Sequence, residues 1–371
     1  MQSNFRLLVV RMGAMGDILH ALPGMTALRQ VHPEWGIDWV VEPRWRALLA
    51  AEDSAGRGPA QPLVDRLYLA PVKDWGRAPL NPKTIHEIRD LRRALRAGNY
   101  DAVLDLQGAV RSALVGRLAG CRRLIGEAEP REPVARWLFA ERVATCGVHM
   151  VEQDVELAAA VAGDELTPTS AWLPVDAAAE AWAGDVVSRG ASRPGSPQTA
   201  VEGTGPRPWG GSQAVLLSPG AGWGAKRWPA ERYAAVANGL IDHGLRVLVN
   251  AGPGEEPLAE AIVQGAGGAA IPLACSLGQL IALTRRVALC IGGDTGPLHL
   301  ACALGRPVVG IFGPTDPNRN GPFGGRFRVL RSPESRRDHA RRAAPEAAML
   351  NIQPEEVLRA AVELLAEETA P

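Results

Sequence analysis

The chain has 371 residues, more than the roughly 100 to 200 of one ordinary domain, so its length predicts two domains. Its 40 Lys and Arg residues balance 40 Asp and Glu residues, and this zero net charge argues against nucleic acid as the partner. Hydrophobic residues make up 46% of the chain, which excludes intrinsic disorder for most of it. With 41 Gly and 30 Pro residues to form turns, the composition indicates a folded α/β protein.

The cysteines and the N-terminus predict a cytoplasmic protein. There are five cysteines, an odd number without a C-x-x-C pair, and we expect reduced thiols. The apolar run near the N-terminus is too short for a signal peptide, and nowhere do about 18 apolar residues follow one another. We therefore expect neither export nor a membrane span, while contact with a membrane surface stays open.

In the first half, short runs of Val, Leu and Ile alternate with longer segments of helical periodicity, which is typical of a doubly wound parallel sheet. The predicted strands are residues 5–10, 37–41, 66–69, 102–106 and 122–125. Predicted helices cover residues 82–97 and 109–119, and a further helix begins within residues 174–180. We place an N-terminal Rossmann-like domain at residues 1–180.

The composition changes at residues 188–213, which contain few apolar residues and many Gly, Pro and Ser, so we predict a linker or long flexible loop at residues 181–213. Predicted strands then resume at residues 214–217, 245–249, 270–273, 287–291 and 307–312. They define a second Rossmann-like domain at residues 214–345, followed by a closing helix within 346–371. Because ligands bind at the carboxyl ends of strands in open α/β sheets, we expect an active site in a central cleft between the domains.

A Gly-rich turn, RMGAMGD, follows the first strand at residues 11–17. Gly13 and Gly16 permit a tight turn, but the pattern fails the G-x-G-x-x-G dinucleotide fingerprint. Asp17 would also repel a pyrophosphate at this helix start. The carboxylate could instead accept a proton from a substrate hydroxyl, or it could simply cap the helix.

A second Gly-rich turn, GGDTGPLHLA, follows the predicted strand at residues 287–291. Thr295 and Gly296 are placed to cap the next helix, whose free amides could hold a phosphate. Asp294 could orient this turn or bond a sugar hydroxyl. His299, one turn into the helix, either contacts the ligand or fills an ordinary helical position.

A third turn, PGAGWGAKRWP at residues 219–229, contains Gly220 near its start and Lys226 near its end. It is not a P-loop, because Ala225 stands where Gly is required and Arg227 where Ser or Thr would hold magnesium. Lys226 is one of only three lysines in the chain. Its ammonium could neutralise a diphosphate as a point charge.

The sequence gives little support to a metal or another cofactor, and we expect neither. There is no H-x-x-x-H, paired Cys or D-x-D pattern. Glu255 and Glu256 open the helix after residue 254, where a carboxylate could bond ribose hydroxyls or serve the helix start. Helix ends and Lys226 would then have to neutralise any diphosphate.

Together, motifs from both halves resemble glycosyltransferase family 9, the bacterial heptosyltransferases. They are MGDILHALP (15–23), IDWVVE (37–42), NYDAVLDLQGAVRSAL (99–114), REP (131–133), KRWP (226–229), GGDTGPLHLACALGRP (292–307) and FGPTDP (312–317). The resemblance implies a GT-B fold and inverting transfer of L-glycero-D-manno-heptose from an ADP-activated donor to Kdo of lipid A. It further implies work in lipopolysaccharide inner-core synthesis, with peripheral contact at the inner face of the inner membrane.

The resemblance also assigns roles to individual residues. Asp17 matches the general base, and Lys226 matches the cation on the donor phosphates. Glu256 matches the acid that binds the ribose, although the neighbouring Glu255 could align with the same family position. The donor-binding turn is matched by Asp294, Thr295, Gly296 and His299, and we add Gly220 from the lysine turn. Where relatives carry hydroxyl residues before the lysine, this chain has Ala221 and Gly222, so backbone amides must supply part of the phosphate binding.

Four basic residues lie on loops suited to the carboxylates of the acceptor: Lys73, Arg77, Arg111 and Arg131. For each of them, a solvated surface charge is the alternative. We expect a monomer. Other functions stay open at this point: a heptosyltransferase II-like enzyme or an epimerase, a nicotinamide oxidoreductase, which the missing fingerprint disfavours, and a module that only binds a nucleotide sugar.

Overall fold

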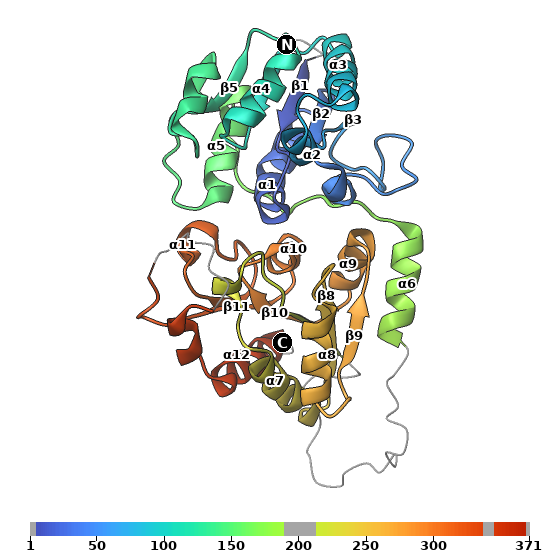
Figure 1. The fold of residues 1–371 in the computed structure, drawn as a ribbon, viewed down its shortest axis with the longest axis vertical. Coiled ribbons are helices and arrows are strands. Elements are labelled where there is room, and N and C mark those ends of the chain that lie inside the picture. The colour runs from blue at the N-terminus through green and yellow to red at the C-terminus, as the bar shows by residue number, and fades with distance from the viewer. Residues whose placement is uncertain (1–4, 189–212, 337–344, 369–371) are drawn as a thin grey trace. The chain divides into compact units, whose positions relative to one another are not determined.

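The computed structural model describes residues 5–188, 213–336 and 345–368 (Figure 1). The chain forms two compact units, Met1–Asp176 and Ala177–Pro371. Of the linker predicted at residues 181–213, residues 189–212 lie outside the described part. Residues 181–188 belong to helix α6 (Ala177–Ser188), which packs on α9 (Leu277–Thr284) of the C-terminal unit.

The N-terminal unit is built on a sheet of six parallel strands in the order β3-β2-β1-β4-β5-β6. The strands are β1 (Arg6–Val10), β2 (Gly36–Val41), β3 (Arg66–Leu69), β4 (Ala102–Asp105), β5 (Leu124–Glu127) and β6 (Glu141–Val143). The helices are α1 (Met15–Val31), α2 (Val72–Arg77), α3 (Pro82–Ala97), α4 (Val110–Leu118) and α5 (Met150–Ala162), with 3₁₀ turns η1 (Pro43–Leu48) and η2 (Pro133–Leu138). The doubly wound parallel sheet predicted for this half is confirmed.

The C-terminal unit repeats the design with the strand order β12-β11-β10-β7-β8-β9. Its strands are β7 (Ala214–Ser218), β8 (Arg246–Ala251), β9 (Ile271–Ala274), β10 (Leu289–Gly293), β11 (Val308–Phe312) and β12 (Phe327–Arg331). Besides α6 and α9 it contains α7 (Ala230–Asp242), α8 (Glu256–Gly265), α10 (Gly296–Ala303), α11 (Pro317–Asn320) and α12 (Pro354–Glu368), with η3 (Gly224–Lys226) and η4 (Ala347–Asn351).

Each sheet has its own hydrophobic core, because parallel strands covered on both faces bury nearly every side chain. In β1 and β7, residues 7–10 and 214–217 are buried without exception. Helix α12, predicted from amphipathic spacing, contributes the fully buried Val357 and Leu364 to the core of the C-terminal unit. The cores hold the central strands, and with them the turns at their carboxyl ends, in fixed positions.

The order of the strands creates a switch point in each unit. From β1 the chain builds β2 and β3 on one side and then returns to place β4 on the other; β7 is flanked by β8 and β10 in the same way. At such a point the turns after the two central strands diverge, and ligands bind between them. The Gly-rich turns singled out above follow β1, β7 and β10, so they lie at the two switch points.

Candidate active site

In the C-terminal unit, a buried carboxylate joins the two turns at the switch point. Asp294, after β10, accepts from the Nζ of Lys226, after β7, at 2.5 Å to its Oδ2. Its other oxygen, Oδ1, lies 2.9 Å from the Nε2 of His299 on α10. Burial raises the pKa of Asp294, but its contacts with His299 and Lys226 outweigh burial and hold that pKa well below its ordinary value. The structure therefore brings together three residues that the sequence placed in the donor site.

The lysine is held in one position at this turn. Its Nζ also donates to the Asp294 backbone carbonyl at 3.3 Å and lies 4.5 Å from the centre of the Trp223 ring. Only 13% of the Lys226 side chain is exposed. A cation fixed by a carboxylate and an aromatic face is preorganised, so it can meet a phosphate without first losing its rotamer freedom.

Helix α10 begins beside this cluster. Thr295 occupies the N-cap position and Gly296 the first helical position, as the sequence predicted. Thr295 does not cap through its side chain; its Oγ1 donates to the Gly293 carbonyl at 3.3 Å instead. The first amides of a helix have no acceptor within the helix, so the start of α10 offers N–H groups to an anion next to Lys226.

Gly220 and Glu255 lie against each other across the same edge of the sheet. A Cβ on Gly220 would collide with the Glu255 carboxylate, so a larger residue there would require that carboxylate to move. The Oε2 of Glu255 also accepts from the Gly252 N–H at 3.1 Å. Glu256 is the first residue of α8 and is exposed. The structure thus places Glu255 against the lysine turn. Glu256, which the family resemblance assigned to the ribose, lies outside that contact.

In the N-terminal unit, Asp17 is the third residue of α1. Its Oδ2 accepts from the Ala14 N–H at 2.9 Å, so one oxygen does serve the helix start. Its Oδ1 lies 4.0 Å from an Nη2 of Arg11, and 39% of the side chain is exposed. Capping by one oxygen and proton transfer through the other are therefore compatible.

Behind Asp17 lies a buried ion pair that the sequence reasoning missed. Arg11, at the end of β1, is 3% exposed and donates from Nε to the Asp17 backbone carbonyl at 3.1 Å. Its Nη2 lies 3.9 Å from Oδ2 of Asp154, a buried residue of α5. Burial, with lesser contributions from the charges of Asp17 and Glu127, raises the pKa of Asp154 to about 7 in spite of Arg11. The sequence did contain a signal for a buried carboxylate, because helical periodicity places Asp154 on the same apolar face as Val151 and Val155.

The turn after β4 braces the turn after β1. The Oδ1 of Asp105 accepts from the N–H groups of Gln107 and Gly108, each at 2.8 Å, and the Oε1 of Gln107 accepts from the Met12 N–H at 2.9 Å. Burial raises the pKa of Asp105 to about 6 although these N–H groups oppose the shift. Gly108 has φ +62°, a left-handed conformation that favours glycine. Sequence reasoning missed this support as well.

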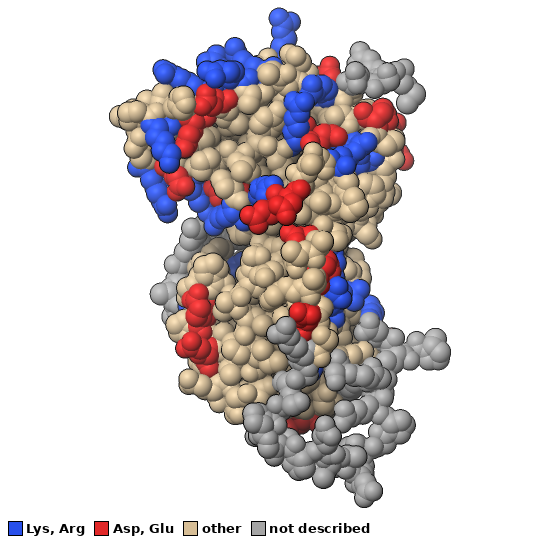
Figure 2. Space-filling model, turned by 90° about the vertical axis from the view of Figure 1, so that its right-hand side faces the viewer, with Lys and Arg blue, Asp and Glu red and all other residues tan. Residues whose placement is uncertain are grey.

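The four basic residues suggested for the acceptor all lie beyond carboxyl ends of strands in the N-terminal unit. Lys73 and Arg77 belong to α2 after β3, Arg111 to α4 after β4, and Arg131 follows β5. All four are exposed, and Arg77 contacts Asp74 at 3.2 Å. Figure 2 shows acidic and basic side chains interspersed over one face of this unit. The topology brings the four residues to the same sheet edge as Asp17, and nothing in their contacts assigns them a ligand.

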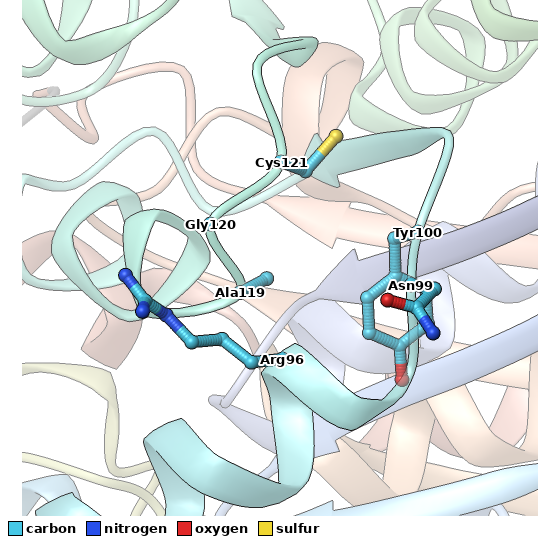
Figure 3. A pocket seen from close by; sticks show the side chains of 6 residues that line it. All are labelled: Arg96, Asn99, Tyr100, Ala119, Gly120 and Cys121. Atoms are coloured by element: carbon cyan, nitrogen blue, oxygen red, sulfur yellow. The ribbon is translucent and has the colours of Figure 1, made fainter.

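The open hollow drawn in Figure 3 lies elsewhere. It is lined by Arg96, Asn99, Tyr100, Ala119, Gly120 and Cys121. These residues precede β4 and β5, so the hollow lies at the amino ends of the strands, opposite the edge that carries Asp17. It does not belong to the candidate active site.

Two further observations concern metals and membranes. Within residues 5–188, 213–336 and 345–368, no three or more His, Cys, Asp or Glu side chains gather as metal ligands would. Among the helices of the same ranges, none is both long and apolar enough to span a bilayer.

Comparison with known proteins places this geometry in a family. The sequence profile of glycosyltransferase family 9 (heptosyltransferase) matches residues 88–349. Lipopolysaccharide heptosyltransferase 1 of Escherichia coli K12 is 30% identical over 338 residues, which cover 88% of this chain and 94% of the relative. Lipopolysaccharide heptosyltransferase 2 of the same strain is 27% identical over 383 residues, covering 98% of this chain and 100% of the relative.

A solved structure agrees with the sequence relatives. The E. coli heptosyltransferase WaaC with ADP-2-deoxy-2-fluoro heptose superposes with a TM-score of 0.71 at 28% identity, covering 99% of this chain and 100% of WaaC. The chain belongs to glycosyltransferase family 9, and it is a glycosyltransferase with the GT-B fold. The nicotinamide oxidoreductase considered above is thereby excluded.

Proposed function

We propose that this protein transfers L-glycero-D-manno-heptose from ADP-heptose to Kdo of lipid A, with inversion, at the inner face of the inner membrane. The similarity to lipopolysaccharide heptosyltransferase 1, and to a heptosyltransferase whose structure was solved with ADP-2-deoxy-2-fluoro heptose, supports the donor and the pathway. The observation that carries the chemistry is the cluster of Lys226, Asp294 and His299 at the start of α10, a preorganised site for a diphosphate.

In this mechanism the acceptor hydroxyl attacks the anomeric carbon of heptose, and the bond from that carbon to the oxygen of the β-phosphate breaks. Asp17 takes the hydroxyl proton through Oδ1, because Oδ2 is engaged with the Ala14 amide. The negative charge that develops on ADP is met by Lys226 and by the amides at the start of α10. The reaction requires donor and acceptor to meet, so both substrates must be bound at the same time.

Other residues bind the two substrates. We assign the ribose hydroxyls to the acidic pair Glu255 and Glu256, and favour Glu255 because its carboxylate lies against Gly220 in the lysine turn. Lys73, Arg77, Arg111 and Arg131 remain candidates for the acceptor carboxylates, since all four follow strands at the edge that carries Asp17. The proposed reaction uses no metal, because cations and amides of the chain itself neutralise the leaving group.

The decisive experiment measures ADP release from ADP-heptose with no acceptor, with Kdo-lipid A, and with Kdo-lipid A that already carries one heptose. Release with Kdo-lipid A alone among the three supports the proposal. Release only with the heptosylated acceptor would assign the activity suggested by the similarity to heptosyltransferase 2. Conversion of the donor without an acceptor would indicate an epimerase, and tight donor binding without release in any arm would indicate a binding module.

A further inference from the structure

A second surface of the N-terminal unit carries exposed apolar side chains that the proposed reaction does not use. In the 3₁₀ turn η2, Trp137 is 66% exposed and Val134 is 64% exposed. Leu114 on the neighbouring helix α4 is 52% exposed. Most large apolar side chains of the unit are buried in its core, so a Trp with two-thirds of its surface in water calls for a partner.

Two arginines lie beside this tryptophan ring. The guanidinium carbons of Arg136 and Arg142 each lie 5.1 Å from the centre of the Trp137 ring. Arg117 donates from Nε to the Leu138 carbonyl and so joins the exposed side of α4 to η2. Leu114 lies one turn before Arg117 on the same helical face. We call the surface formed by Leu114, Arg117, Val134, Arg136, Trp137 and Arg142 the Trp137 surface.

The charge of the surrounding segment has one dominant sign. Residues 108–148 contain seven arginines and four glutamates, whereas the whole chain is neutral. Three of the glutamates are engaged locally: Glu132 accepts from the Val110 N–H at 2.8 Å, Glu127 accepts from the Thr145 hydroxyl at 2.9 Å, and Glu141 pairs with Arg123 at 2.9 Å. The arginines at the Trp137 ring therefore act as a local positive field around an apolar centre.

We infer that the Trp137 surface rests on an anionic lipid bilayer, with Trp137, Val134 and Leu114 at the level of the headgroups and the arginines against lipid phosphates. Tryptophan and arginine share this preference for the membrane interface, because each combines an apolar body with a polar end. Exposed apolar side chains with arginines beside them match a negatively charged bilayer better than they match the neutral surface of a second copy of this chain.

If the Trp137 surface rests on the bilayer, the proposed lipid acceptor would lie close to two of the basic residues suggested for acceptor binding. Arg131 lies two residues before the start of η2, and its backbone N–H lies against Gly108 in the turn after β4. Arg111 shares α4 with Leu114 and Arg117. Two of the four candidates for acceptor binding, Arg111 and Arg131, thus adjoin the Trp137 surface. A bilayer at this surface would present a lipid-anchored sugar beside them. That role rests on the proposed acceptor, whereas the lipid binding itself does not.

The test is cosedimentation of the full chain with vesicles of phosphatidylcholine alone or mixed with phosphatidylglycerol, at low and high salt. We expect binding to the anionic vesicles only, weakened by salt because screening reduces the attraction of arginine for phosphate. Trp137→Ala should weaken this binding about fivefold to tenfold, and Arg136→Ala with Arg142→Ala about tenfold or more. Because these side chains are exposed, the variants should fold normally.

Matched controls separate this surface from general effects of charge and of tryptophan. Trp172→Ala removes another exposed tryptophan of the same unit, and Arg92→Ala with Arg93→Ala removes two exposed arginines of α3. The controls should bind like the unchanged protein. Equal losses in the controls, no preference of the unchanged protein for anionic vesicles, or self-association through this surface in analytical ultracentrifugation would overturn the inference.

Activity assays separate this inference from the proposed function. Trp137→Ala should turn over a water-soluble Kdo acceptor at the normal rate, but lose about fivefold or more of the rate on acceptor embedded in anionic vesicles. Equal loss on both acceptors would overturn a membrane role for Trp137. If no acceptor supports turnover while the vesicle binding follows the pattern above, the proposed function fails and the lipid surface stands.

Discussion

The turns at the two switch points occupy equivalent places in sheets of the same topology, yet their ion pairs are arranged in opposite order. In the N-terminal unit the cation is hidden and the anion is accessible, because Arg11 is buried while 39% of the Asp17 side chain is exposed. In the C-terminal unit the anion lies deeper, and Asp294 holds Lys226 at the start of α10. One scaffold thus offers a proton acceptor in one unit and an anion site in the other.

The buried carboxylates at the two turns, Asp154 and Asp294, differ in the direction of their pKa shifts. Burial raises the pKa of both Asp154 and Asp294. Asp294 has partners at 2.5 and 2.9 Å that reverse the effect, whereas Asp154 has its cation only at 3.9 Å and keeps a raised pKa of about 7. The distance to the nearest cation therefore decides whether a buried carboxylate stays ionised at neutral pH.

Removing the accessible anion should have the largest effect on activity. Asp17→Asn keeps the shape of the side chain but cannot accept the acceptor proton, so kcat should fall about 10²- to 10⁴-fold. ADP affinity, measured by calorimetry, should change less than twofold. Asp90→Asn, which changes an exposed carboxylate of α3, is the matched control and should keep the normal rate. A near-normal rate in Asp17→Asn would reject this residue as the base.

Removing the cation of the other unit should act on binding instead. Lys226→Met deletes a charge-assisted contact to the donor diphosphate, worth about 1.5 to 3 kcal/mol, so the Kd for ADP should rise roughly 10- to 150-fold. Lys83→Met, at an exposed position of α3, should leave the Kd unchanged. Thermal unfolding should accompany the measurement, because Asp294 loses one of its two partners. Unchanged ADP affinity in a folded Lys226→Met would place the diphosphate elsewhere.

The pH dependence of stability should separate the two buried carboxylates. With a folded pKa of about 7 and an unfolded pKa near ~3.9, Asp154 binds more protons in the native state, so its contribution to the free energy of unfolding falls as pH rises from about 4 to about 7. The slope is at most about 1.4 kcal/mol per pH unit. The stability of Asp154→Asn relative to the unchanged protein should therefore increase as pH rises from 5 to 7.

Asp294→Asn should have the opposite effect on the free energy of unfolding. The folded pKa of Asp294 is lowered, so its ionised form stabilises the native state at every pH above the unfolded value and is lost only in stronger acid. This variant should be destabilised throughout the range from pH 5 to pH 8, as expected when a buried charge pair loses one member. Parallel melting curves for both variants would contradict the contrast drawn here.

Local patterns predicted most of the fold, because the central strands are continuous apolar runs and helix starts carry recognisable residues. The helix predicted at residues 82–97 coincides with α3, where Asn81 caps the first turn and Pro82 opens it. One strand in each sheet was missed, β6 and β12. Both are edge strands with exposed charged residues, such as Glu141 and Arg142 in β6, so they lack the buried apolar run that identifies the others.

The site residues that stand in glycine-rich turns could be predicted from the sequence. The residues whose role depends on burial and on contacts between distant segments could not. Asp17, Lys226 and Asp294 stand in turns directly after strands, so their place at a switch point follows from the sequence. The contact of Asp154 with Arg11 joins residues that are more than a hundred positions apart, and local spacing cannot reveal it. The choice between neighbouring Glu255 and Glu256 likewise depends on which carboxylate the folded turn directs toward Gly220.

Testing Glu255 against Glu256 should give the smallest of the predicted effects, and each of the two residues serves as the control for the other. Glu255→Gln should weaken ADP binding about fivefold to tenfold, because a charged acceptor of the ribose hydroxyls becomes a neutral amide of the same shape. Glu256→Gln, one residue further and exposed, should change the Kd less than twofold. Calorimetry with ADP and with 2′-deoxy-ADP makes the assignment specific, since the loss at Glu255 should vanish for a nucleotide that lacks the bonded hydroxyl. The reverse pattern would return the ribose to Glu256 and leave the Glu255 carboxylate as a structural contact between the Gly220 and Gly252 turns.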